Sequence, residues 1–145
     1  MVTLLDKTDL GDIKTLENIQ FLVKTFYGHA RQDELLAPIF DKSITNWDDH
    51  LPTMYQFWER LLFKTGDYQG NPFDKHVKLP VGKEHFAVWI KIFLRTVDDN
   101  FYGPKANEAK RLARSIAATF QMRMGIKGYD SEYAVPDYKH PGESK

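Results

Sequence analysis

The sequence predicts an all-α fold, on the basis of two patterns and the chain length. Apolar residues recur at spacings of three and four almost throughout, which is the period of helices with one buried face. No segment alternates apolar and polar residues over enough positions to form a sheet. The length of 145 residues is typical of one domain. We therefore expect a single helical domain.

The first half of the chain contains three segments with this helical period. They are expected over residues 15–31, 33–40 and 46–64. The first carries an apolar stripe that starts at Leu16. The second is a short turn of helix that Pro38 interrupts, because proline lacks a backbone N–H donor. The third follows Asn46, a favourable N-cap, and its stripe starts at Trp47.

Two longer segments follow in the second half. They are expected over residues 82–102 and 104–124. The first of them has an apolar stripe from Phe86 to Phe101, and the second has one from Ala109 to Phe120. Pro104 stands where the last helix begins, and proline is favoured at the first helical position.

The connection over residues 65–82 does not fit a simple bundle. It is about eighteen residues long, whereas helices in compact bundles are joined by roughly 2–8 residues. Its apolar side chains, among them Tyr68 and Phe73, argue against disorder, and a long ordered connection is usually functional. We assign residues 1–12 to an N-terminal extension, 13–126 to the folded domain and 127–145 to a polar C-terminal tail.

Composition excludes several classes of function. Twenty basic residues balance twenty acidic ones, which disfavours nucleic acid and anionic membranes as partners. No stretch of ~18 apolar residues exists to cross a membrane, and the first residues do not resemble a signal peptide, so we expect a cytoplasmic protein. The absence of cysteine excludes disulfides, thiol catalysis and iron–sulfur clusters. Any metal must be held by nitrogen or oxygen, with five histidines available.

Four polar side chains fall on apolar stripes or in the long connection. His50 lies on the stripe of its helix, His76 lies in the connection, and Tyr27 and Trp89 lie on the buried faces of two other helices. Each alone is explained by an ordinary role, as a satisfied core residue or an exposed loop histidine. Together they come from four segments, and a core that holds all four either contains water or surrounds a ligand with a polar centre.

The remaining histidines carry less weight. His29 falls off the Tyr27 face, His85 lies at the exposed start of a helix and His140 lies in the tail, so we interpret all three as structural or incidental. Nucleotide-binding glycine motifs, the metalloprotease His-Glu-x-x-His and the serine-hydrolase elbow are all missing. The acidic pairs Asp48–Asp49 and Asp98–Asp99 are adjacent in sequence, so their side chains diverge on a helix and do not form an acid–base pair. These absences favour a bound ligand over conventional catalysis.

The sequence resembles the truncated (2-on-2) haemoglobins, in particular their third group, from about residue 16 to residue 120. Seven short motifs occur in the family's order and at compatible spacing. They are Phe26-Tyr27, Pro38-Ile39-Phe40, Trp47-Asp48-Asp49-His50, Phe57-Trp58, the run from Tyr68 to Pro72, His76 with Leu79-Pro80, and His85-Phe86-Ala87-Val88-Trp89. The glycine pairs of the other groups are absent. The resemblance implies a globin-like 2-on-2 helical sandwich around haem.

The resemblance also implies a role for each matching residue. His76 matches the proximal haem ligand, and Tyr27, His50 and Trp89 match the distal residues over the sixth iron position. For His50 three roles stay open: to gate ligand entry, to stabilise the ligand, or to bind the iron itself when no ligand is present. Phe40 matches the aromatic that packs on the haem face. Further envelope residues are Met54 and Phe57 on the distal wall, then Phe73, Phe86 and Phe93, with Lys75, Lys78, Glu84 and His85 as neighbours of the propionates.

The implied cofactor is haem b, held without covalent links because the chain has no cysteine. The implied ligands are O2, NO and CO. Two distal donors would slow O2 release, which favours redox chemistry between O2 and NO, or peroxide activation, over transport. The alternative is an oxygen store, a carrier or a sensor of diatomic gases without turnover, and a helical protein that binds no haem is a third. We further expect a monomer, and the resemblance leaves a reductase partner open.

Overall fold

The computed structural model describes residues 10–66, 68, 70 and 79–127, and this part of the chain is helical without strands. The all-α prediction is confirmed. The helices are α1 (Leu16–Ala30), α2 (Ala37–Ser43), α3 (Trp47–Phe63), α5 (Lys83–Asn100) and α6 (Pro104–Arg123). None of the described helices is both long and apolar enough to cross a membrane.

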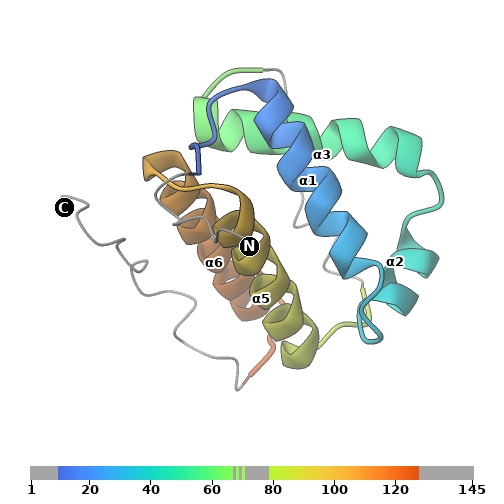
Figure 1. The fold of residues 1–145 in the computed structure, drawn as a ribbon. Helices are drawn as coiled ribbons and strands as arrows, with labels where there is room; N and C mark the ends of the chain where they lie inside the picture. The colour runs from blue at the N-terminus through green and yellow to red at the C-terminus, as the bar shows by residue number, and fades with distance from the viewer. Residues whose placement is uncertain (1–9, 67, 69, 71–78, 128–145) are drawn as a thin grey trace, which may run out of the picture.

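The four long helices form two packed pairs. α1 packs against α3, and α5 packs against α6 (Figure 1). α1 also contacts α5, and α3 contacts α6, so the pairs are stacked on each other. In Figure 1, α1 crosses α3, whereas α5 and α6 run side by side. This arrangement is the two-on-two sandwich that the resemblance implied.

The core lies between the two pairs and is rich in aromatic side chains. Phe93 of α5 is only 1% exposed and its ring stacks on Trp58 of α3, with centroids 4.9 Å apart and planes 17° from parallel. Phe26 of α1 contacts the edge of Phe93 at 5.5 Å. Since flat rings from three helices meet here, the core is held by large contacts across both pairs.

Most helix ends follow from local sequence, and one expectation was wrong. The Thr15 side chain accepts a hydrogen bond from the Asn18 N–H, and Asn46 accepts one from the Asp49 N–H, which confirms Asn46 as an N-cap. α2 begins later than predicted and runs on to Ser43, with Pro38 in its first turn. Proline therefore helps to start this helix instead of interrupting it, because the first-turn N–H groups need no intrahelical partner.

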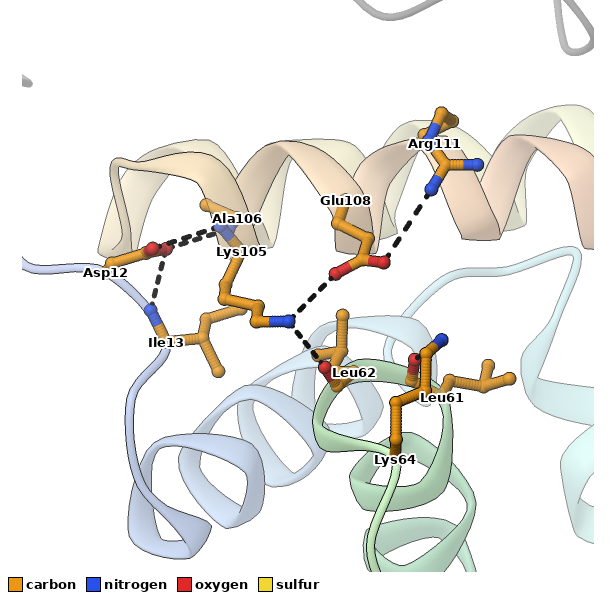
Figure 2. A network of polar contacts seen from close by, with 9 residues as sticks. All are labelled: Asp12, Ile13, Leu61, Leu62, Lys64, Lys105, Ala106, Glu108 and Arg111. Atoms are coloured by element: carbon orange, nitrogen blue, oxygen red, sulfur yellow. Dashed lines mark hydrogen bonds and ion pairs between the residues drawn. The ribbon is translucent and has the colours of Figure 1, made fainter.

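Asp12 joins the start of the chain to the N-terminus of α6 (Figure 2). Its carboxylate accepts hydrogen bonds from the backbone N–H groups of Ala106 at 2.8 Å and Lys105 at 3.0 Å. The Lys105 ammonium group in turn donates to the carbonyl oxygen of Leu62, in the last turn of α3, at 2.7 Å. Gly103 makes this approach possible, because its φ is +146° and a Cβ there would lie 2.5 Å from the Asp12 Cγ.

Candidate functional site

A cavity of about 260 Å³ lies between the helix pairs. Side chains from α1, α2, α3, α5 and α6 line it, together with Tyr68, Leu79 and Val81 from the connection. Eight of the residues that the resemblance assigned to the haem contacts are among them: Tyr27, Phe40, His50, Met54, Phe57, Phe86, Trp89 and Phe93. Glu84, an expected neighbour of the propionates, is exposed and does not line the cavity. Phe73, Lys75, His76 and Lys78 lie outside the described residues.

One wall of the cavity is built from flat aromatic rings. Trp89 and Phe93, four residues apart on α5, lie nearly parallel with centroids 5.9 Å apart, and Phe93 continues the stack onto Trp58. Phe26 closes against the edges of Trp89 and Phe93. Because residues four apart share a helix face, this wall follows directly from the apolar stripe of α5. Such a surface suits a flat, apolar ligand.

The polar part of the cavity centres on a contact between α1 and α3. The Tyr27 hydroxyl oxygen lies 3.0 Å from Nε2 of His50, a hydrogen bond whose donor depends on the tautomer of the imidazole. Tyr27 is buried, and loss of water around it raises the pKa of its hydroxyl well above the usual value. The hydroxyl therefore keeps its proton and its capacity to donate a hydrogen bond.

Neighbouring rings enclose this hydrogen bond. Phe40 of α2 contacts the edge of Tyr27 at 5.7 Å, and Trp47 contacts Tyr27 at 5.1 Å and His50 at 5.6 Å. Trp47 does not line the cavity, so it contacts Tyr27 and His50 on the side away from the cavity. Trp89 of α5 also lines the cavity, and its indole carries an N–H donor.

His85 was predicted to be a structural or incidental residue at the exposed start of a helix, while the resemblance implied a neighbour of the propionates; the expected exposure was wrong. It is half-buried and lines the cavity, and its Nδ1 accepts a hydrogen bond from the Gly82 N–H at 2.9 Å. This contact caps α5 and leaves the neutral imidazole proton on Nε2. The signal was present in the sequence, because His85 precedes Trp89 by four residues and so shares its face.

Tyr68 is a lining residue that the sequence did not assign to the site. Its ring contacts the edge of Phe57 at 5.3 Å, and partial burial raises the pKa of its hydroxyl. It comes from the long connection, where no helical period places side chains. The sequence therefore shows that Tyr68 is aromatic, but it does not show that its side chain points into the cavity.

The described lining carries no lysine, arginine, aspartate or glutamate side chain. Within residues 10–66, 68, 70 and 79–127, no three metal-ligating side chains come together either. The polar groups of the described lining are therefore hydroxyl, imidazole and indole groups. The cavity can accommodate an apolar ligand and donate hydrogen bonds to one part of it.

Comparison with known proteins places this architecture among the globins. The chain is 34% identical over 110 residues to the group 3 truncated hemoglobin ctb of Campylobacter jejuni, a match that covers 72% of this chain and 87% of the relative. The crystal structure of a group III truncated hemoglobin from Campylobacter jejuni superposes with a TM-score of 0.73 at 32% identity. That match covers 81% of this chain and 96% of the other. No family model matches the sequence.

Proposed function

The chain belongs to the group III truncated haemoglobins, and we propose that it holds haem b without covalent links and uses it for redox chemistry between O2 and nitric oxide. Members of this family are globin-type haem proteins that bind diatomic ligands. The observation that carries the proposal is the placement of Tyr27, His50 and Trp89 on one cavity whose lining is mostly apolar. A reductase partner, a monomeric state and a cytoplasmic location stay predictions from the sequence.

The described lining fits a haem. Its aromatic wall offers flat apolar surface to a macrocycle, and its uncharged character suits a site in which polar contacts are few. In this proposal Phe40, Met54, Phe57, Phe86 and Phe93 form the envelope, and Phe73 completes it from outside the described residues. With no cysteine in the chain, neither a thiolate ligand nor a thioether link is available.

His76 is proposed as the proximal ligand, on its match to the family motif. A ligating histidine usually donates its second ring N–H to a carbonyl or carboxylate, which orients the ring and raises its basicity. His76 lies outside the described residues, so this role depends on the sequence. The proposal assigns no permanent bond to the iron to Tyr27, His50 or Trp89.

The distal residues supply donors to a ligand that becomes more negative. When bound, haem supplies an iron that coordinates a diatomic ligand and shifts electron density onto it. Tyr27 stays protonated in its buried position, and Trp89 is a donor at any pH. A hydrogen bond to a charged group contributes about 1.5–3 kcal/mol. Since ~1.4 kcal/mol changes a rate tenfold, two such donors slow O2 release greatly.

Slow release favours reaction of O2 over its transport, and a rapid-mixing experiment separates the two. The reduced protein, equilibrated with O2, is mixed with nitric oxide, and nitrate is measured. We expect stoichiometric nitrate at a rate far above that of O2 release. Consumption of nitric oxide no faster than O2 release would instead support a store, carrier or sensor. Peroxidase-like turnover is tested separately with peroxide and a reducing dye.

A further inference from the structure

α1 and α3 are joined by two neighbouring side-chain contacts, of which the first lies at the cavity. On α1, Tyr27 is followed four residues later by Arg31, the C-cap. On α3, Trp47 is the first residue and His50 follows three residues later. Residues at these spacings share a helix face. Tyr27 meets His50 through a 3.0 Å hydrogen bond, and the Arg31 guanidinium carbon lies 4.2 Å from the centroid of the Trp47 ring.

Trp47 contacts the rings of Tyr27, His50 and Phe40, which we call the polar cluster, without lining the cavity itself. Its centroid lies 5.1 Å from Tyr27, 5.6 Å from His50 and 6.1 Å from Phe40, each in an edge-to-face arrangement. A shift of the indole would therefore be transmitted to Tyr27 and His50 together. The indole is a support for the hydrogen bond, and Arg31 is the group that holds the indole from the solvent side.

The position of Tyr27 and His50 in the fold explains why their hydrogen bond needs support from neighbouring side chains. α1 ends at Ala30 and α3 begins at Trp47, so the polar cluster lies where both helices end, and helix ends open more readily than helix centres. The short helix between them, α2, contributes no buried residue. The ring cluster bridges α1 and α3 at this corner. A cation on the face of a tryptophan, which is the strongest aromatic partner for a cation, adds a further contact between the same two helices.

We propose that Arg31 and Trp47 are positioning residues, which hold Tyr27 and His50 in hydrogen-bonding geometry and so set the donor strength of the cavity. This inference rests on the proposed function for its consequence, since the donors matter only if a diatomic ligand is bound beside them. The contact itself exists without the ligand. Arg31 and Trp47 act through Tyr27 and His50, and neither touches the ligand.

The test uses the full-length protein with Arg31→Met, Arg31→Lys and Trp47→Phe. Lys24→Met is the matched control, because it removes an exposed cation from the same helix away from the cavity. The first readout is the infrared stretching band of CO bound to the haem-loaded protein, which moves to lower wavenumber when a donor faces the ligand. The second is the ¹⁵N spectrum of labelled histidine, which reports the protonation and hydrogen bonding of each His50 ring nitrogen.

In Arg31→Met and Trp47→Phe, we expect a high-wavenumber CO band whose share rises about two- to fivefold, the factor that an exposed cation–π contact represents. Arg31→Lys restores most of the original band, and Lys24→Met leaves it unchanged. The His50 nitrogen signals shift in the same variants and in Tyr27→Phe. Unfolding curves identify any variant that has lost its fold, and Arg31→Met alters no core side chain.

Two results separate this inference from the proposed function. If Tyr27→Phe moves the CO band while Arg31→Met and Trp47→Phe leave both readouts unchanged, the positioning role is overturned. If the chain takes up no haem, the proposed function fails, and the ¹⁵N spectrum of the unloaded protein still decides whether Arg31 and Trp47 hold the contact between Tyr27 and His50.

Discussion

The Tyr27 hydroxyl lies 3.0 Å from Nε2 of His50, a contact that joins α1 to α3 at the wall of an apolar cavity. Both groups can exchange the donor role with each other, and either can turn to a ligand that enters beside them. The same contact also links helices of one pair, so it has structural as well as chemical consequences.

The buried Tyr27 hydroxyl makes stability depend on alkaline pH. Its pKa is raised in the folded protein, above the ordinary value of 10.0 that the unfolded chain retains. The stabilising contribution is therefore complete below pH 10 and is lost as pH rises above it, by at most about 1.4 kcal/mol per pH unit. We expect wild type to lose more free energy of unfolding than Tyr27→Phe between pH 9 and about pH 11, measured by urea titration. Parallel loss in both proteins would contradict this origin.

Two glycine substitutions are expected to have opposite signs. Gly28→Ala adds a methyl group to α1 where no atom lies within 4 Å, and should stabilise by about 0.5–1 kcal/mol. Gly103→Ala places a Cβ 2.5 Å from the Asp12 Cγ at a φ of +146°, and should destabilise by at least about 2 kcal/mol. Thermal and urea unfolding measure both. Equal effects would mean that the link between Asp12 and α6 is not formed.

The stacked wall predicts a large loss on truncation. Phe93 is 1% exposed and stacks on both Trp58 and Trp89, so Phe93→Ala should cost about 3–5 kcal/mol in free energy of unfolding. Phe21, which is 50% exposed, is the matched control, and Phe21→Ala should cost less than about 1.5 kcal/mol. A small loss of free energy of unfolding in Phe93→Ala would show that the surrounding side chains close the gap easily, so that the stacked rings are not a preformed wall.

His76 is expected to carry the iron. His76→Ala should greatly weaken the Soret absorption of purified or reconstituted protein, and added imidazole should restore part of it, since the vacated position accepts an exogenous ligand. His29→Ala, on the exposed side of α1, is the control and should match wild type. An unchanged Soret band in His76→Ala would transfer the proximal role to another residue.

The helices were predictable because their apolar stripes and caps are local, as at Asn46 and Pro104. The start of α2 was not, because a proline both ends and begins helices, and the choice depended on the packing of the corner. Tyr27, His50 and Trp89 could be placed on inward faces by periodicity, whereas their meeting on one cavity followed from the family resemblance. The contact between Arg31 and Trp47 escaped prediction, since a cation–π contact between helix ends leaves no pattern in sequence.

The expected exposure of His85 was wrong for a similar reason. Its position beside Glu84 at a helix start suggested exposure, but its imidazole accepts a hydrogen bond from the Gly82 N–H and lines the cavity. A capping contact of this kind depends on side-chain direction at one residue. Local composition does not contain that information.

The rate of O2 dissociation tests the central claim, that buried donors on this cavity retain the ligand. It is measured by displacement with CO in wild type, Tyr27→Phe and Trp89→Phe, with Lys24→Met as the control. Loss of either donor should speed release by about tenfold or more, as expected for one hydrogen bond to a charged ligand. Release from wild type as fast as from a simple carrier, and unaffected by both substitutions, would contradict the account.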